Sequence, residues 1–264
     1  MNSVGSATSG DGTLIAYRRT GGDGPPVIMV GGAFSTAETE APLASLLAPR
    51  FSVVTYDRRG RGGSGDRAPY AVEHEIADLA ALLEEVGGSA CVYGTSSGAA
   101  LALEAAATGL PITQLAVYEP PYEAGAAVST ARAGYPARLG DLLARGLRDE
   151  AVELSLAMVG TTPDEVARMR GAAMWQGLTA LAHTLVYDHA VVGPGPVPVE
   201  RLARITARAM VVEGGASPPP TRAAARAVAD ALPRGRQRTL TGQVHTVAPH
   251  VLAPVLAEFF AEAA

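Results

Sequence analysis

A serine flanked by two glycines lies between a short apolar run and an alanine-rich stretch. The residues Gly94-Thr95-Ser96-Ser97-Gly98 follow the apolar run at 90–93 and precede an alanine-rich run at 99–107. A strand, a G-x-S-x-G pentapeptide and a helix in this order are typical of a sharp turn that holds a serine hydroxyl clear of the backbone. The pentapeptide alone is weak evidence, because glycine and serine are common in turns. In this context we predict that Ser96 is a nucleophile.

A serine nucleophile needs a neighbouring base, and one histidine lies where such a base is expected. His245 follows the last predicted strand in a loop at 241–246, from which an imidazole could reach Ser96. It would act as general base toward the serine and then as general acid toward the leaving group. We interpret His74 and His250 as surface or capping residues. We interpret His183 and His189 as candidates for substrate contact or for packing.

The elements that must position these residues are visible as alternating apolar and amphipathic patterns. Runs rich in Val, Ile and Tyr predict strands at 13–18, 26–30, 52–56, 90–93, 114–119, 209–213 and 238–240. Apolar residues at helical spacing predict helices at 71–86, 97–107, 221–232 and 251–261. This alternation indicates an α/β fold with a mostly parallel central sheet flanked by helices.

The segment between the two groups of strands has helical periodicity and no convincing strand. Helices are predicted at 136–145, 150–158, 163–170 and 174–187, and the run at 192–198 is rich in Gly and Pro, which is typical of a hinge or linker. An insertion between two sheet strands would lie over their carboxyl ends, where open α/β sheets bind ligands. We therefore predict a core formed by 1–120 and 203–264 and an inserted helical cap at 121–202.

The composition of the chain limits the classes of function that it could have. The chain has 264 residues and a formal net charge of −5 with interspersed charges, which predicts one globular unit without a basic face for nucleic acid. No signal peptide or membrane-spanning run is apparent, so we expect no membrane association and a cytoplasmic location. Cys91 is the single cysteine, which excludes an internal disulfide and a multi-cysteine metal site. It lies in a predicted strand and is expected to be buried.

A glycine-rich run at 60–65 fits G-x-G-x-x-G, the pattern of a dinucleotide-binding turn. No helix is predicted to begin there, and the acidic residue about twenty positions on, Asp78, falls inside a predicted helix. We interpret the run as a loop. The sequence thus predicts no cofactor and no metal, and it leaves the oligomeric state open.

Several motifs in order make the chain similar to the α/β-hydrolase superfamily over essentially its full length. They are 11–13 before the first predicted strand, 30–34 after the second, 56–65 after the third, the serine turn, and 242–245 near the end. The resemblance implies an α/β-hydrolase fold, with the backbone N–H groups of Ala33 and Ser97 forming the oxyanion hole and Phe34 as an alternative to Ala33. The chain has Gly31-Gly32 where the family usually has His-Gly. That difference predicts a roomier or more mobile loop.

The acid that orients the histidine differs from the usual family pattern. The family commonly places an aspartate after the strand that here ends at 213, and Ser217 occupies that position. Glu119, which ends the strand at 114–119 and precedes two prolines, is the strongest candidate, and Glu213 is the second. Haloalkane dehalogenases and zearalenone-type lactonases resemble the Glu119 arrangement. The lactonases also resemble this chain in a Ser-Ser-Gly turn and in a cap tryptophan comparable to Trp175.

These inferences predict a cofactor-independent serine hydrolase that cleaves a small-molecule ester or lactone through an acyl-enzyme, with Ser96, His245 and Glu119 as catalytic residues. The same residues would serve a carbon–carbon bond hydrolase or a cofactor-free perhydrolase. A hydrolase-like ligand receptor without catalysis is a further alternative, because fold alone does not determine activity. Four aromatic or histidine side chains are expected to contact the substrate: Phe34, Trp175, His183 and Tyr187.

Overall fold

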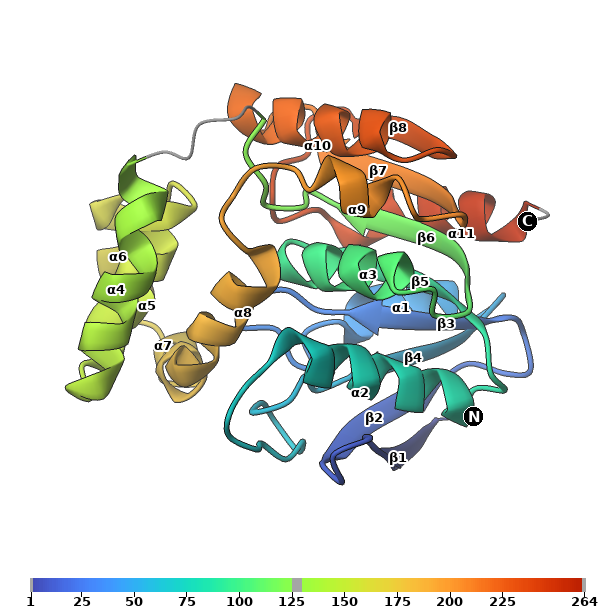
Figure 1. Ribbon diagram of the computed structural model, residues 1–264, viewed down its shortest axis with the longest axis horizontal. Helices are drawn as coiled ribbons and strands as arrows, with labels where there is room; N and C mark the ends of the chain where they lie inside the picture. Colours follow the sequence, from blue (N-terminus) through green and yellow to red (C-terminus); the bar gives the residue numbers. More distant parts are fainter. Residues whose placement is uncertain (1, 125–129, 263–264) are drawn as a thin grey trace.

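An eight-stranded sheet forms the centre of the protein in a computed structural model that describes residues 2–124 and 130–262 (Figure 1). The strand order is β1-β2-β4-β3-β5-β6-β7-β8. Strands β1 and β2 pair antiparallel with their neighbours, and all the other pairs are parallel. The strands are β1 (Ser3–Thr8), β2 (Leu14–Thr20), β3 (Pro26–Val30), β4 (Ser52–Tyr56), β5 (Ala90–Thr95), β6 (Ile112–Tyr118), β7 (Arg208–Gly214) and β8 (Gly235–Leu240).

Helices cover both faces of this sheet, and the central strands are therefore apolar on both sides. One face packs on α2 (Val72–Glu85), α3 (Ser97–Ala107), α9 (Val199–Leu202) and α10 (Pro219–Ala231). The other face packs on α1 (Ala41–Leu47) and α11 (Pro249–Ala261). Along β3, Val27 and Met29 point to the second face while Ile28 and Val30 point to the first. The α/β-hydrolase fold class predicted from the sequence is confirmed.

The predicted elements differ from the structure mainly at the beginning of the chain. Strand β1 was not predicted, because its polar sequence at the sheet edge carries no apolar alternation. Residues 11–13 therefore lie in the turn between β1 and β2 rather than before the first strand. The Thr13 N–H donates to the Asp11 carboxylate at 2.9 Å in this turn. The short helix α1 was also missed.

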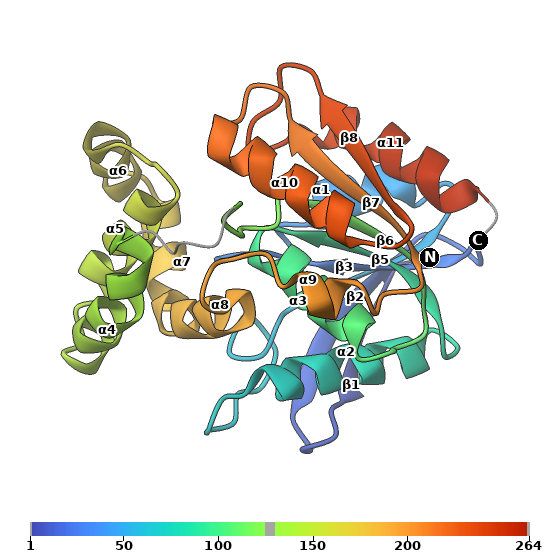
Figure 2. The same cartoon turned by 45° about the horizontal axis from the view of Figure 1, so that its top comes forward.

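Between β6 and β7 lies a group of helices that we call the cap helices. They are α4 (Thr130–Ala144), α5 (Arg148–Met158), α6 (Pro163–Arg170), α7 (Met174–Ala180), the 3-10 turn η1 (Ala182–Thr184) and α8 (Leu185–Val192). Figures 1 and 2 show α4 to α7 set to one side of the sheet, with α8 lying next to α3. They pack around a separate apolar cluster that includes Leu139, Val152 and Trp175.

The single helix predicted at 174–187 is wrong, because the chain bends at η1 and resumes as α8, which ends at Val192. Helix α6 has the predicted bounds, and the Thr162 and Glu165 side chains form a reciprocal capping box at its start.

Cys91 is buried in β5 as expected, and burial raises the pKa of its thiol. Within residues 2–124 and 130–262, no helix is long and apolar enough to cross a membrane.

Candidate active site

Ser96 lies in a strained turn between β5 and α3. Its backbone angles are φ 53° and ψ −125°, a region that non-glycine residues rarely adopt, and its N–H donates to the Tyr118 carbonyl at 2.9 Å. The flanking glycines are needed because the backbones are close. A Cβ on Gly94 would lie 2.6 Å from the Gly98 oxygen, and one on Gly98 would lie 2.3 Å from the Val30 oxygen. The sequence therefore fixes a turn that presents the Ser96 side chain at the carboxyl edge of the sheet.

Glu119 and His245 contact each other at the same edge. The Glu119 Oε2 lies 2.7 Å from the His245 Nδ1, although the residues are far apart in sequence. Glu119 directly follows β6 with φ 44°, and its side chain is fully buried, whereas 48% of the His245 side chain is exposed. The chain thus holds a buried carboxylate against one nitrogen of an imidazole whose ring reaches the pocket.

The second oxygen of Glu119 is held by the loop after β7. Glu119 Oε1 accepts hydrogen bonds from the Gly214 N–H at 2.8 Å and the Ser217 hydroxyl at 2.5 Å. Burial would raise the pKa of the Glu119 carboxyl, but the bonds from His245, Ser217 and Gly214 hold that pKa below its ordinary value. Ser217, which occupies the usual acid position of the superfamily, therefore supports the carboxylate that lies at the end of β6.

Glu213, the second candidate acid, has different partners. Its carboxylate accepts two hydrogen bonds from the Gln237 amide at 2.9 Å and one from the Thr239 hydroxyl at 2.7 Å. Both donors belong to β8, so these contacts tie β7 to the edge strand of the sheet.

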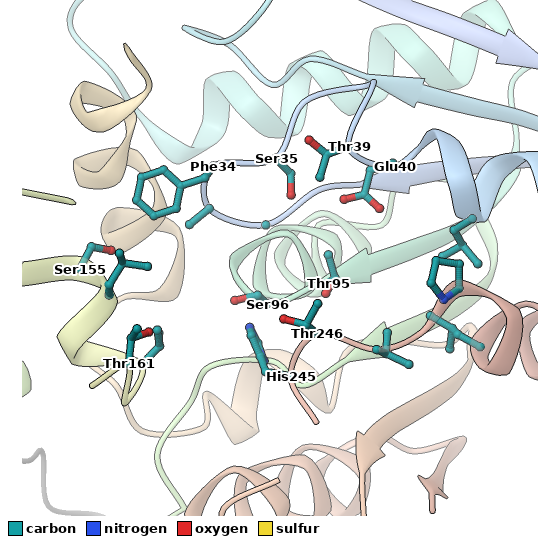
Figure 3. Close-up of a pocket in the computed structure, with 18 of the residues that line it drawn as sticks. Phe34, Ser35, Thr39, Glu40, Thr95, Ser96, Ser155, Thr161, His245 and Thr246 are labelled. Atoms are coloured by element: carbon teal, nitrogen blue, oxygen red, sulfur yellow. The ribbon is translucent and has the colours of Figure 1, made fainter. Parts of the chain in front are cut away.

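A pocket of about 560 Å³ opens beside Ser96 and His245. Figure 3 shows the His245 ring next to Ser96, with Phe34 and Ser155 toward the cap helices and Thr39 and Glu40 on the opposite side. Phe34 lines this pocket and has a positive φ of 62°. The two groups expected to perform chemistry therefore lie in the middle of one cavity.

Ala33 and Ser97, the expected oxyanion-hole residues, line a second cavity of about 150 Å³ that also reaches Ser96. Ser97 is the first residue of α3, so its N–H is one of those without a partner inside the helix and lies at the positive end of the helix dipole. The loop at 31–32 is close-packed rather than roomy. A Cβ on Gly31 would lie 2.6 Å from the Ser35 Cβ, and one on Gly32 would lie 3.0 Å from the Ser96 Cβ.

Three of the residues expected to contact substrate do not line either cavity at Ser96. The buried indole of Trp175 packs among the cap helices, and its Nε1 donates to Asp149 at 2.5 Å. The Tyr187 ring stacks on Tyr70 at 4.0 Å and its hydroxyl donates to Asp66 at 2.9 Å, while His183 packs edge-on to Tyr187. In the structure, contacts within the protein engage these side chains, and their role in binding substrate stays a prediction.

A buried ionic cluster behind Ser97 was missed in the sequence. Asp188 of α8 accepts hydrogen bonds from Arg58 at 2.7 Å, from Arg61 at 2.8 Å and from the Ser97 hydroxyl at 2.7 Å. Arg58 also pairs with Glu75 at 2.7 Å. Burial would raise the pKa of Asp188, but the charges of Arg61 and Arg58 and the bond from Ser97 lower it. An acid within the mostly apolar sequence of α8 was the available signal, because a buried charge needs partners.

The glycine-rich run at 60–65 forms a loop that carries Arg61, as interpreted from the sequence, and Arg58 lies just before it. The Ser64 hydroxyl donates to the Asp57 carbonyl at 2.5 Å, and Arg61 donates to the Gly32 carbonyl at 2.5 Å. The run therefore connects β4 to the loop beside Ser96. In the described part of the chain, no group of three or more His, Cys, Asp or Glu side chains is placed to hold a metal ion.

Comparison with known proteins agrees with this geometry. The profile of the alpha/beta hydrolase family matches residues 27–257. An alpha/beta hydrolase from Sphaerobacter thermophilus is 53% identical, with 97% of this chain and 100% of that chain covered and a TM-score of 0.90. A hydrolase from Pseudomonas aeruginosa shares the fold at 21% identity, with 98% of each chain covered and a TM-score of 0.75.

A curated relative is the N-formylmaleamate deformylase of Pseudomonas putida, which is 34% identical over 140 residues. The match covers 52% of this chain and 50% of the deformylase, so the chain spans about half the length of that relative. The profile match and the Sphaerobacter structure each extend over most of the chain. The chain belongs to the alpha/beta hydrolase family.

Proposed function

We propose that this protein is a serine hydrolase that cleaves a carboxylic ester or lactone through an acyl-enzyme intermediate. The observation that carries the proposal is the contact between the Glu119 carboxylate and His245 Nδ1 at 2.7 Å, beside a strained serine in the same pocket. A carboxylate on Nδ1 fixes the tautomer that leaves Nε2 free to accept a proton. Such an arrangement serves nucleophilic catalysis by Ser96.

The reaction follows from these positions. The Ser96 oxygen attacks the carbonyl carbon while its proton passes to His245 Nε2, and Glu119 stabilises the resulting imidazolium. The N–H groups of Ala33 and Ser97 would hold the negative oxygen of the tetrahedral intermediate. His245 then returns the proton to the leaving alcohol as the C–O bond breaks. Water attacks the acyl-enzyme by the same route and releases the acid.

The contacts favour Glu119 over Glu213 as the acid. Glu119 contacts the imidazole, whereas the Glu213 oxygens accept from side chains of β8. The position of Glu119 after β6 is the feature in which the chain resembles zearalenone-type lactonases, which supports a lactone or ester substrate. A carbon–carbon bond hydrolase or a cofactor-free perhydrolase would use the same groups.

A second candidate is hydrolysis of an N-formyl amide. It is favoured by the 34% identity to the N-formylmaleamate deformylase over half of each chain. Ser96 would attack a formyl carbon with the same help from His245 and Glu119, and an amide nitrogen would replace the alcohol oxygen in the leaving group. The two candidates therefore differ in the acyl group that is transferred to Ser96 and in the group that leaves.

A substrate panel with Ser96→Ala as control tests the proposal. The wild type should hydrolyse at least one member of a set of short-chain esters, aryl esters, lactones and N-formyl amides, and Ser96→Ala should lose turnover while keeping its melting temperature. A fluorophosphonate probe should label the wild type alone. Turnover preserved in Ser96→Ala would contradict Ser96 as the nucleophile. A wild type that neither turns over a substrate nor is labelled would contradict the proposal and favour a non-catalytic receptor.

A further inference from the structure

Glu40 lies in the wall of the Ser96 pocket, on the side away from the cap helices. It directly precedes α1, and Figure 3 shows its carboxylate beside Ser35 and Thr39, across the pocket from His245. No step proposed above uses this carboxylate. An acidic side chain inside a reaction pocket is uncommon unless it binds something.

The position of Glu40 depends on the unusual glycine at 31. A Cβ at Gly31 would lie 3.3 Å from the Glu40 Oε1 and 2.6 Å from the Ser35 Cβ. A side chain such as the histidine usual in the superfamily would therefore compete with Ser35 and Glu40 for this space. With glycine there, the carboxylate approaches the loop that carries Gly32, whose own Cβ position is 3.0 Å from the Ser96 Cβ.

Within the described residues, no arginine or histidine forms an ion pair with Glu40. Burial raises the pKa of its carboxyl, and a hydrogen bond from the Ser35 side chain opposes this in part. A carboxylate has room for about four hydrogen bonds, so one hydroxyl leaves much of its accepting capacity unused. Glu40 is among the side chains that line the cavity, where a ligand could use this capacity.

The pocket extends in two directions from Ser96. Toward the cap helices it is lined by apolar side chains such as Leu156, Val159 and Met169. Toward the core it continues between α1 and α11, where Glu40 lies among Leu43, Tyr93 and Leu252. A substrate bound at Ser96 would place its acyl part in one arm and its alcohol part in the other. The core-side arm therefore combines apolar side chains, a few hydroxyl groups such as those of Ser35 and Thr39, and one acidic group.

We propose that Glu40 is a specificity-determining residue that selects substrates carrying a hydrogen-bond donor, a hydroxyl or amino group, on the part that enters the core-side arm. This inference rests on the proposed function, because it assigns the substrate class of the same pocket. A substrate without a donor would desolvate the carboxylate and leave it unpaired. Sites that hydrogen-bond a substrate group reject analogues that lack the group far more strongly than apolar sites reject a missing methylene.

Four esters test the proposal without assuming which part enters the arm. Ethyl hexanoate is compared with ethyl 6-hydroxyhexanoate for the acyl part, and hexyl acetate with 6-hydroxyhexyl acetate for the alcohol part. In the wild type, one hydroxy ester should exceed its plain partner in kcat/KM by about 10- to 100-fold, the range for a hydrogen bond to a charged group. In Glu40→Leu this ratio should fall to near 1, and Glu40→Gln, which retains an accepting oxygen, should lie between.

The matched control is Glu38→Leu, which removes the same charge from an exposed position two residues earlier. It should keep the wild-type ratio. Melting temperatures of all variants show whether each is folded, and Glu40→Gln provides a nearly isosteric change should Glu40→Leu fail to fold.

Binding separates this inference from the proposed function. The dissociation constants of the same esters are measured by calorimetry on Ser96→Ala protein, with and without Glu40→Leu. Turnover that survives Ser96→Ala would contradict the proposed function while the affinity ratio still tests Glu40. An affinity ratio that Glu40→Leu leaves unchanged, or no measurable binding of any of the four esters, overturns the inference even when Ser96→Ala abolishes turnover.

Discussion

At the scale of single residues, the carboxylate that contacts His245 lies after β6, and a serine lies after β7 where the superfamily usually has an aspartate. Glu119 after β6 contacts His245 through Oε2, and the Ser217 hydroxyl after β7 donates to the other carboxylate oxygen, Oε1. The sequence alone identified Ser217 as unable to replace a carboxylate. It did not indicate that the hydroxyl would bind the substitute acid, because that contact joins two loops far apart in the chain.

Replacing Glu119 tests this arrangement. Glu119→Gln keeps the shape of the side chain but removes the charge that stabilises imidazolium, so we expect turnover to fall on the order of a thousandfold or more. Glu213→Gln is the matched control, and kcat should change little, because its carboxylate contacts Gln237 and Thr239 of β8. Near-normal kcat in folded Glu119→Gln together with collapse in Glu213→Gln would show that the acid is Glu213.

Substitution of Ser217 tests whether an acid at the usual superfamily position can replace Glu119. Ser217→Asp alone should lower turnover, since it places a second carboxylate within hydrogen-bond distance of Glu119. In the Glu119→Gln background, the same change should restore part of the lost turnover by supplying an acid at the usual family position. Steady-state kinetics of both single variants and the double variant measure the coupling. If the losses of turnover in the two single variants simply added in the double variant, the proposed coupling between positions 119 and 217 would be contradicted.

At the scale of elements, helix α8 and the loop after β4 meet at Asp188. This carboxylate joins a cap helix to two core arginines and to Ser97, whose N–H is proposed for the oxyanion hole. The chain bends at η1 before it enters α8, and in this course Asp188 contacts Arg58 and Arg61.

Removing the charge of Asp188 should destabilise the protein. Asp188→Asn removes the carboxylate shared by two buried arginines, of which Arg58 keeps Glu75 whereas Arg61 loses its ion pair. Breaking a buried pair typically costs about 3–5 kcal/mol of unfolding free energy. Denaturant unfolding of the variant against the wild type measures this loss. Asp141→Asn is the control, because Asp141 forms an exposed i,i+4 pair with Arg145 that contributes little. Equal stability of the wild type and Asp188→Asn would contradict the structural role.

The same carboxylate predicts a pH dependence. The pKa of Asp188 is lower in the folded protein than its ordinary value, so the folded state gains stability above the unfolded-state pKa of about 4. That gain is lost as the pH falls through the lower folded-state pKa. The unfolding free energy of the wild type should therefore decrease in acid more steeply than that of Asp188→Asn. If the unfolding free energies of the two proteins decreased equally as the pH is lowered, this assignment would be contradicted.

At the scale of the whole molecule, the order of strands and helices in the parallel core could be predicted because their patterns are strong. Buried parallel strands are continuous apolar runs, and α2 and α10 carry one apolar stripe each. Strand β1 and the bend before α8 could not be predicted. Both involve contacts with other parts of the chain, which the local sequence does not reveal.

The active-site residues also divide into those that a local pattern predicts and those whose contacts are with distant parts of the chain. Ser96 and His245 are predicted from a local turn pattern and from chain order, and both line one pocket in the structure. Trp175 was expected there because it is an aromatic residue of the cap, but its indole packs inside the cap helices. Asp188 and Glu40 were missed, since their importance lies in contacts that sequence spacing does not reveal.

The most direct test of the central claim is intact-mass analysis of the protein quenched in acid during turnover of an ester or lactone substrate. The account predicts that the wild type gains the mass of the acyl group, that peptide mapping places the adduct on Ser96, and that Ser96→Ala gains none. His245→Ala should gain it far more slowly. Turnover without any acyl adduct under rapid quench, or an adduct on another residue, would contradict an acyl-enzyme at Ser96.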